Sequence, residues 1–289
     1  MRGARTLVDL LRSKQDNDKS LGQHFLINDD LIALSLQYGE IDKQDHVLEI
    51  GPGPGVLTEA LLMQGCRVTA IEIDEGAVKH LQKVFASEIT SGQLNLLSGD
   101  ALQAKWPDSI SKVVANIPYQ ISSPLVELLT KYLRNDESKL LQKVVLLVQE
   151  EFAERLVVEW ESDKGSLGMC TMLDWDCTFE MRVGPHCFSP SPQIHSRLVT
   201  MTRIESPDNS KLVKMLIRQA FSQRRKKIRN TLSKAPKRIS RVSGWHAKAY
   251  RDAMQSIDCA FIDERPEDLD LEDWLELARL LEDARAAMG

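Results

Sequence analysis

A hydrophobic segment that runs into three closely spaced glycines restricts the fold of this chain more than any other feature. The segment is Val47-Leu-Glu-Ile-Gly-Pro-Gly-Pro-Gly55, and its pattern predicts a buried strand, a tight turn and then a helix. At Gly51, Gly53 and Gly55 the missing side chains allow the turn and let a ligand approach the backbone. A dinucleotide-binding fingerprint would need its third glycine at position 56, where the chain has Val56. The turn therefore predicts a ligand site of another kind.

Apolar strands alternate with helical patterns between residue 46 and about residue 203. This alternation predicts an α/β fold with a doubly wound, mostly parallel sheet. Such sheets bind ligands beyond the carboxyl ends of their strands, and the glycine turn lies at one of these ends. The expected strands are His46–Ile50, Arg67–Ile71, Leu94–Leu97, Lys112–Ala115, Lys143–Val148, a pair within Leu167–Val183, and His195–Thr202. The expected helices between them include Gly55–Gln64, Glu75–Phe85, Ser123–Leu133 and Glu150–Glu159.

Two acidic residues follow the next two predicted strands. Glu72 ends the strand after the glycine turn, and a carboxylate at this spacing commonly accepts both hydroxyls of a ribose. Asp100 follows the third strand and can accept a hydrogen bond from an adenine amino group. Alternatively both acids only cap helices or lie in solvent, with Asp74 competing for the capping role. Because Glu49 adds negative charge suited to a cation, the set favours S-adenosylmethionine, which combines ribose, adenine and positive charge.

Asn116-Ile117-Pro118-Tyr119 follows the fourth predicted strand and is suited to hold a flat base that bears an amine. An exocyclic adenine amine is a poor nucleophile because its lone pair is delocalised into the ring. If Asn116 and a backbone carbonyl beside Pro118 accept its two hydrogens, the lone pair is directed at a methyl donor. Pro118 has no competing N–H, Tyr119 can stack on the base, and positioning supplies most of the catalysis. As an isolated motif it is equally typical of a proline turn after a strand.

The pattern becomes wholly helical after Glu205-Ser-Pro207. We therefore predict three regions: a mobile polar arm over residues 1–20, a catalytic domain over 21–204 that binds the cofactor, and a helical domain over 205–289. The expected helices of the last domain are Ser210–Phe221, Arg224–Ser233, Ala247–Ile257 and Asp270–Ala286.

The net charge of −5 hides an uneven distribution of acidic and basic residues along the chain. No acidic residue occurs from Lys211 to Arg241, whereas acidic residues are frequent from Asp263 to the end. Basic side chains without acidic neighbours favour RNA binding through phosphates. The alternative is a solvated helix face that pairs with the acidic tail. The candidate RNA-binding residues are Arg224, Arg225, Lys226, Lys227 and Arg229.

The five cysteines include no Cys-x-x-Cys pair, so reduced thiols are expected, and neither a disulfide framework nor a zinc site. His186 and His195 flank Cys187, but their spacing matches no standard metal site, and no metal is predicted. The sequence has no apolar run that could cross a bilayer and no signal peptide at its start. We therefore expect a cytoplasmic protein.

The four motifs around Gly51, Glu72, Asp100 and Asn116 occur in an order that resembles the ribosomal small-subunit RNA adenine dimethyltransferases. The resemblance runs from Lys19 to about Leu232. It also includes Lys19-Ser-Leu-Gly-Gln-His-Phe-Leu26, Gln149-Glu-Glu-Phe-Ala-Glu-Arg-Leu156, Phe188-Ser-Pro-Ser-Pro192 and Phe221-Ser-Gln-Arg-Arg-Lys-Lys-Ile-Arg-Asn230.

This resemblance implies a Rossmann-like class I methyltransferase fold and dimethylation of N6 on two adjacent adenosines near the 3′ end of small-subunit rRNA during ribosome assembly. It further implies that His24 and Leu26 touch the cofactor, and that Phe188 sandwiches the target base against Tyr119. Many bacterial members have Asn at the position of His24, so the histidine indicates an archaeal or eukaryotic branch. We expect the immature small ribosomal subunit as the partner, no membrane contact, and a monomer.

Two other functions are compatible with these residues. A related adenine methyltransferase can act on large-subunit rRNA or on DNA, because the same pocket serves any presented adenine. A non-catalytic assembly or transcription factor can keep the fold and the RNA-binding surface. The intact glycine turn and the intact Asn116–Tyr119 motif argue against the second alternative.

Overall fold

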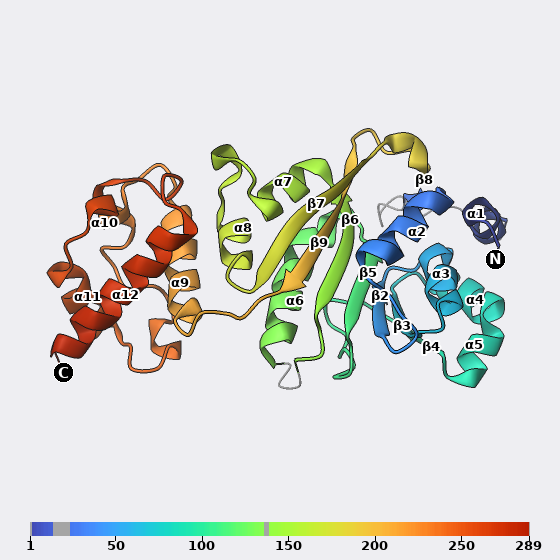
Figure 1. Cartoon of the computed structure of the whole chain (residues 1–289), viewed down its shortest axis with the longest axis horizontal. Coiled ribbons are helices and arrows are strands. Elements are labelled where there is room, and N and C mark those ends of the chain that lie inside the picture. The colour runs from blue at the N-terminus through green and yellow to red at the C-terminus, as the bar shows by residue number, and fades with distance from the viewer. Residues whose placement is uncertain (1, 14–23, 136–138, 289) are drawn as a thin grey trace. The chain divides into compact units, whose positions relative to one another are not determined.

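The computed structural model describes residues 2–13, 24–135 and 139–288, except for the side chain of Tyr119. The chain divides into two compact units (Figure 1). The first comprises residues 1–153 and 176–203, and the second comprises residues 154–175 and 204–289. The helical unit therefore includes a segment, residues 154–175, that the sequence analysis assigned to the catalytic domain.

The first unit is built on a seven-stranded sheet of order β4-β3-β2-β5-β6-β9-β7 (Figure 1). Parallel pairing joins β2 to β3 and β5, β3 to β4, and β5 to β6, whereas β6 and β9 are antiparallel. The expected doubly wound, mostly parallel sheet is thus confirmed. The chain extends from β2 through β3 to β4 on one side and from β5 to β6 on the other, so the strand order reverses between β2 and β5. The strands are β2 (His46–Ile50), β3 (Arg67–Glu72), β4 (Leu94–Ser98), β5 (Lys112–Asn116), β6 (Lys143–Gln149), β7 (Trp175–Val183) and β9 (Ser196–Arg203).

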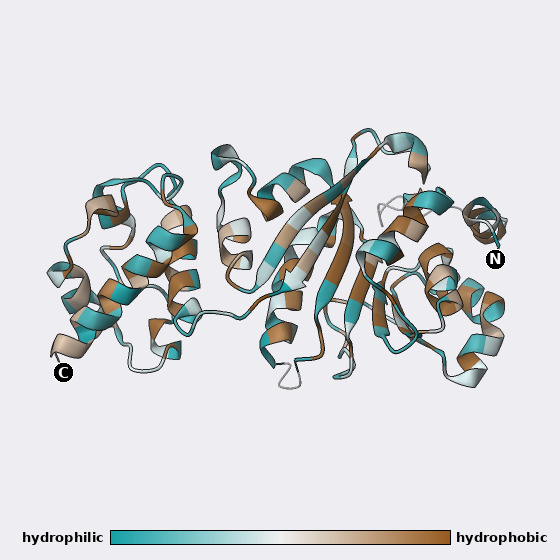
Figure 2. Cartoon of the chain, in the orientation of Figure 1, coloured by the Kyte–Doolittle hydropathy of each residue, from teal (hydrophilic) through white to brown (hydrophobic). Residues whose placement is uncertain are grey.

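Helices pack against this sheet because the strands are apolar on both faces. All five residues of β2 are buried, and Figure 2 shows hydrophobic residues concentrated along the central strands. Asn28 caps α2 by accepting from the backbone N–H of Leu31, and Asp74 caps α4 by accepting from Gly76. The helices are α2 (Asp29–Tyr38), α3 (Val56–Met63), α4 (Glu75–Val84), α5 (Ala86–Ser91), α6 (Ser122–Asn135) and α7 (Glu150–Val157). Short 3₁₀ turns occur at Tyr119–Ile121, Glu161–Asp163 and Pro185–Cys187.

The N-terminal segment differs from its prediction as a mobile arm. Helix α1 (Ala4–Arg12) places Leu7, Val8 and Leu11 on one face, and all three are buried. Their spacing of three and four residues is typical of an amphipathic helix. Residues 14–20 of the predicted arm lie outside the described residues. A small second sheet pairs β1 (Phe25–Leu26) with β8 (Phe188–Ser189) in antiparallel register.

The second unit is helical and has its own hydrophobic core, which includes Tyr250 and Trp274 (Figure 1). The strand pair predicted within Leu167–Val183 is wrong. The first half is helix α8, which packs on α9, and only the second half is a strand, β7. A short apolar run does not distinguish a buried strand from a buried helix by its pattern. The helices are α8 (Ser166–Thr171), α9 (Ser210–Phe221), α10 (Ile228–Thr231), α11 (Ala247–Ser256) and α12 (Leu271–Met288), with 3₁₀ turns at Ile239–Arg241 and Ala260–Asp263.

Within the described ranges, no helix combines the length and the apolar character needed to span a bilayer. The same residues contain no cluster of three or more His, Cys, Asp or Glu side chains suited to hold a metal ion.

Candidate functional site

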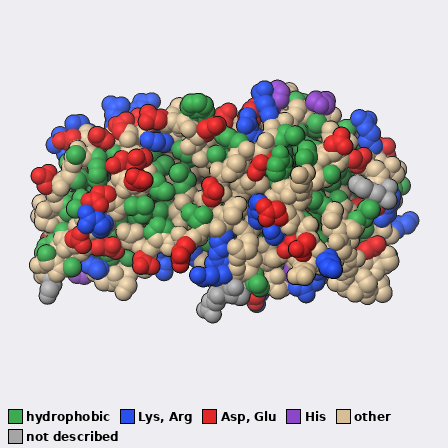
Figure 3. Space-filling view, viewed as in Figure 1, with side chains coloured by type: hydrophobic (Ala, Val, Ile, Leu, Met, Phe, Trp, Pro, Cys, Tyr) green, Lys and Arg blue, Asp and Glu red, His purple; other side chains and the backbone are tan. Residues whose placement is uncertain are grey.

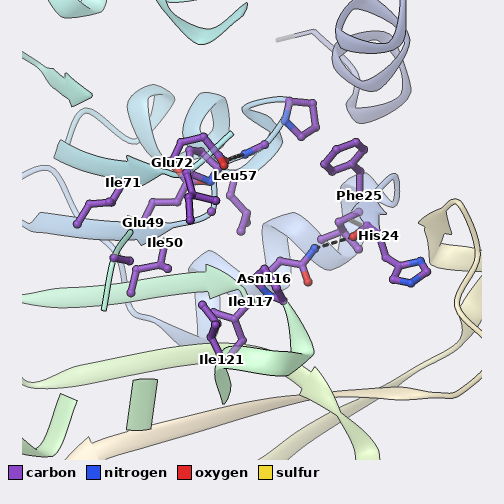
Figure 4. Close-up of a pocket in the computed structure, with 18 of the residues that line it drawn as sticks. His24, Phe25, Glu49, Ile50, Leu57, Ile71, Glu72, Asn116, Ile117 and Ile121 are labelled. Carbon is purple, nitrogen blue, oxygen red and sulfur yellow. Dashed lines mark hydrogen bonds between the residues drawn. The ribbon is translucent and has the colours of Figure 1, made fainter. Parts of the chain in front are cut away.

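A pocket lies at the carboxyl ends of β2, β3 and β5, where the strand order reverses (Figure 4). Open α/β sheets bind ligands at this position because the loops separate there and leave a crevice. The pocket brings together most of the residues predicted from the sequence. Those that line it are His24, Leu26, Gly51, Gly53, Glu72, Asp100, Asn116, Ile117 and Pro118.

The glycine turn has the left-handed backbone that its sequence predicts. The φ angles are 68° at Gly51, 53° at Gly53 and 85° at Gly55. A Cβ atom at Gly53 would lie 2.9 Å from the ring of Phe25, so the turn and the N-terminal segment are in close contact. Gly55 does not line the pocket, although the sequence analysis placed it among the cofactor-binding residues. It is the N-cap of α3, and a Cβ there would lie 2.5 Å from the ring of Phe85.

Glu72 is buried in the pocket wall, with 5% of its surface exposed. Its carboxylate accepts from the backbone N–H of Gly53 at 2.8 Å and from that of Asp74 at 2.9 Å. Asp74, and not Glu72, caps α4, so the capping alternative does not apply to Glu72. Burial raises the pKa of Glu72, while the hydrogen bonds from the Asp74 and Gly53 backbone oppose the rise. Glu72 is therefore a polar acceptor whose orientation the glycine turn fixes.

Glu49 also lines the pocket and is 1% exposed. The hydroxyl of Thr58 donates to its carboxylate at 2.7 Å. Burial raises the pKa of Glu49 to about 8, and the nearby Glu72 carboxylate contributes to the rise. The sequence analysis treated Glu49 as a full negative charge. Burial and the neighbouring Glu72 favour the protonated carboxyl group, and a nearby cation would favour the ionised form.

Asp100 lies at the pocket edge and is partly buried. One carboxylate oxygen accepts from the backbone N–H of Leu102 at 2.9 Å, and the other accepts from the side chain of Gln103 at 2.8 Å. Asp100 therefore both caps the turn that follows β4 and lines the pocket. A carboxylate oxygen has two lone pairs, so these contacts leave capacity for a ligand donor.

Asn116 ends β5 and its side chain is oriented by the N-terminal segment (Figure 4). Its Nδ2 donates to the backbone carbonyl of His24 at 3.2 Å. Because a carbonyl only accepts, the amide nitrogen must face His24 and the Oδ1 atom points away from it. The carbonyl of Pro118 accepts from the backbone N–H of Ile121 at 3.1 Å. The carbonyl of Ile117, in contrast, accepts no hydrogen bond recorded among the described residues.

Of the two residues predicted to stack on the target base, the structure describes the side chain of Phe188 but not that of Tyr119. Phe188 is only 4% exposed and belongs to the hydrophobic core together with Leu26, its partner across the β1–β8 pair. This burial contradicts an open stacking face, and the ring would have to be uncovered before it could contact a base. The Tyr119 side chain lies outside the described residues.

Three of the five predicted RNA-binding residues form ion pairs with the acidic stretch. Arg224 contacts Glu267 at 2.7 Å, while Asp263 contacts both Lys227 at 3.5 Å and Arg229 at 2.9 Å. These three side chains therefore make the ion pairs with the acidic stretch that the alternative predicted, and their RNA binding stays a prediction. Figure 3 shows acidic and basic side chains interspersed over the helical unit at the left of the view. Arg225 and Lys226 are exposed, with no ion pair recorded among the described residues.

Sequence reasoning missed several apolar residues that line the pocket. Phe25 covers the glycine turn, and its place between His24 and Leu26 in a recognised motif was the available signal. Ile71 and Ile73 flank Glu72, and Ile73 is 55% exposed. An exposed apolar residue beside a buried acid suits the flat face of a base, but an isoleucine at a strand end gives no such signal in the sequence.

Comparison with known proteins identifies the family. The family model for ribosomal RNA adenine dimethylase matches residues 14–245. The chain belongs to the ribosomal RNA adenine dimethylase family. Over 275 residues it is 34% identical to ribosomal RNA small subunit methyltransferase A from Prochlorococcus marinus, covering 91% of this chain and 94% of the relative. A probable ribosomal RNA small subunit methyltransferase A from Thermococcus gammatolerans is 32% identical over 242 residues, covering 83% and 81%.

Solved structures agree with this assignment. A dimethyladenosine transferase from Plasmodium falciparum superposes with a TM-score of 0.71 at 26% identity, covering 90% of this chain and 98% of that one. The 23S rRNA methyltransferase ErmE shares the fold, with a TM-score of 0.64 at 23% identity over 89% and 99% of the two chains. The chain is therefore a class I methyltransferase that dimethylates adenine in ribosomal RNA and uses S-adenosylmethionine.

Proposed function

We propose that this enzyme dimethylates N6 of two adjacent adenosines near the 3′ end of small-subunit rRNA in the immature subunit, as a cytoplasmic monomer. One observation carries the proposal: the Asn116 amide is fixed by the His24 carbonyl beside the glycine turn. The names of the bacterial and archaeal relatives support the small subunit as the target. To test the target, the enzyme is incubated with labelled cofactor and immature small subunits, large-subunit rRNA or DNA. Label in dimethyladenosine from small subunits supports the proposal, and preferential labelling of either other substrate contradicts it.

The chemistry of the pocket residues fits S-adenosylmethionine. Glu72 suits the ribose hydroxyls because its buried carboxylate is already oriented by two backbone N–H groups. Asp100, at the end of the next loop, suits the adenine amine, and Ile73 suits the face of that ring. Glu49 suits the positive end of the ligand. The cofactor supplies an electrophilic methyl group on a sulfonium, and these residues bind and orient it.

The target amine requires acceptors and no strong base. The Asn116 Oδ1 atom accepts one of the two hydrogens of the amine, and the Ile117 backbone carbonyl accepts the other. We choose the Ile117 carbonyl because the Pro118 carbonyl already accepts from the backbone N–H of Ile121. Accepting both hydrogens turns the nitrogen lone pair toward the methyl donor. Once the nitrogen is alkylated its proton becomes acidic and leaves to water. Catalysis by these residues is therefore mainly positioning, which can supply several kcal/mol, on the order of 7–11 in favourable cases.

Cofactor affinity should increase with pH up to about 8 and then level off. Below this pH burial favours the protonated form of Glu49, and a cationic ligand favours its ionised form, so binding releases the proton. The groups that face Glu49 are Thr58 from α3 and Glu72 from β3. One released proton gives at most about a tenfold increase in affinity per pH unit. Isothermal titration calorimetry in buffers of different ionisation enthalpy measures the affinity and the proton release.

Two controls distinguish the Glu49 carboxyl from other titrating groups. Glu49→Gln keeps an acceptor for Thr58 but cannot ionise, so its affinity should be nearly independent of pH in this range. S-adenosylhomocysteine lacks the sulfonium charge and should show a shallower dependence in the wild type. Equal slopes for the wild type and Glu49→Gln would show that Glu49 is not the titrating group.

Arg225 and Lys226 are our candidates for direct RNA phosphate contact, because the other three basic residues already pair with acids. The double variant Arg225→Ala/Lys226→Ala should bind small-subunit rRNA more weakly and with a flatter salt dependence. Two lost phosphate contacts reduce the slope of log affinity against log salt by about 1.4 for a single strand. Filter binding across a salt series measures this slope.

A matched variant removes the same charge elsewhere in the helical unit. Lys248→Ala/Arg251→Ala deletes two exposed basic side chains from α11. It should leave the salt slope near that of the wild type. If both double variants flatten the slope equally, the effect comes from net charge and the contact assignment is wrong.

A further inference from the structure

Helix α1 lies outside the stretch matched by the family model, which begins at residue 14. It is nevertheless built into the wall of the catalytic unit. Leu7 and Leu11 are at most 1% exposed and belong to the same hydrophobic core as Leu26 and Phe188. A helix of nine residues is marginal in water by itself, so this packing must supply most of its stability.

Two polar contacts attach the start of α1 on the cofactor side of the unit. The backbone N–H of Ala4 donates to the Asp29 carboxylate of α2 at 2.9 Å. The guanidinium of Arg2 contacts Glu59 of α3 at 2.9 Å. Since α3 begins directly after the glycine turn, this end of α1 is anchored to the element that positions the cofactor pocket.

The other end of α1 contacts the target side. Arg12 lies in the last turn of α1, where a positive charge is favoured by the helix dipole. Its guanidinium donates to the Ser189 hydroxyl of β8 at 2.7 Å. Ser189 is paired in register with Phe25 of β1, and the neighbouring Phe188 is paired with Leu26. Arg12 therefore holds β8 at the position where it meets β1.

The β1–β8 pair leads directly to the catalytic amide. A ring nitrogen of His24, the residue before β1, lies 2.8 Å from the Pro190 carbonyl that follows β8. The backbone carbonyl of the same His24 orients the Asn116 side chain. A continuous series of contacts thus runs from Arg12 through Ser189 and His24 to Asn116.

We propose that α1 is a positioning element for methyl transfer and that Arg12 is its positioning residue. Arg12 does not line the cofactor pocket. By holding Ser189 it fixes β8 against β1, and the His24 carbonyl then keeps the Asn116 oxygen directed at the target amine. The inference rests on the proposed role of Asn116. It assigns a catalytic contribution to residues that precede the stretch matched by the family model.

The test compares Arg12→Ala, Arg12→Lys and Ser189→Ala in the full-length enzyme with immature small subunits. Arg12→Ala should lower kcat about tenfold, while the Kd for S-adenosylmethionine changes less than about twofold. Arg12→Lys keeps a donor for Ser189 and should recover part of the lost rate. Arg5→Ala is the matched control, because Arg5 is an exposed arginine on the same helix. Its kcat should equal that of the wild type.

A double-mutant cycle separates positioning from a general loss of stability. Arg12→Ala/Ser189→Ala should be no slower than either single variant, because both remove the same contact. If Arg12→Ala does not fold, Ser189→Ala and the recovery by Arg12→Lys still test the contact. Wild-type kcat in Ser189→Ala, or multiplicative losses in the double variant, would overturn the inference. If Asn116→Ala were active, the proposed role of Asn116 would fail first, so the two failures are distinguishable.

Discussion

Asn116→Ala should lower the rate of methyl transfer at least about a hundredfold and change the affinity for S-adenosylmethionine less than about threefold. The substitution removes the oxygen that would accept a hydrogen of the target amine, and it removes the amide that the His24 carbonyl orients. The cofactor pocket keeps its glycine turn and its buried carboxyl groups, Glu49 and Glu72, so binding persists. Single-turnover assays on immature small subunits measure the rate, and calorimetry measures the affinity.

Asn95→Ala provides a control for the loss of an asparagine side chain. Asn95 is exposed on β4 and does not line the pocket. Asn95→Ala should therefore leave the rate of methyl transfer and the affinity for S-adenosylmethionine unchanged. Methyl transfer by Asn116→Ala at the wild-type rate would show that another group activates the amine. A loss of cofactor affinity equal to the loss of rate would instead make Asn116 a cofactor-binding residue only.

Gly55→Ala should destabilise the protein by about 2–5 kcal/mol, because backbone strain and a steric clash both oppose the added methyl group. The residue has a φ of 85°, which costs an alanine about 1–2 kcal/mol. Its Cβ would also lie 2.5 Å from the Phe85 ring and 2.8 Å from Leu81. Both side chains are buried in the core and cannot move aside, so the clash adds about 1–3 kcal/mol. Urea denaturation monitored by circular dichroism measures the free energy of unfolding.

Gly92→Ala separates backbone strain from the clash. Gly92 has a similar φ of 79°, but no atom lies within 4 Å of its Cβ position. Gly92→Ala should lower the free energy of unfolding by only about 1 kcal/mol, the strain of the left-handed backbone. Alanine also lowers the conformational entropy of the unfolded chain, and this effect offsets part of the loss. Equal destabilisation by the two variants would mean that strain alone, and not contact with Phe85, makes glycine necessary at position 55.

The sheet and the pocket motifs were predictable because they depend on local patterns. His46–Ile50 was predicted with the bounds that the structure has, since a short apolar run before a glycine turn leaves few alternatives. Glu72 and Asn116 were placed correctly because parallel strands bring their carboxyl ends to one edge of the sheet. The error at Leu167–Val183 has the same origin, because an apolar run without clear periodicity fits either a helix or a strand.

The sequence by itself determined the doubly wound sheet, the glycine turn and the pocket positions of Glu72, Asp100 and Asn116. Only the tertiary structure decided the burial that raises the pKa of Glu49, the burial of Phe188 and the ion pairs that Asp263 forms with Lys227 and Arg229. The physical reason is that backbone conformation and strand pairing follow from residues close together in the chain. Solvent exposure and charge partners depend on side chains brought together from distant segments, and no local pattern contains that information.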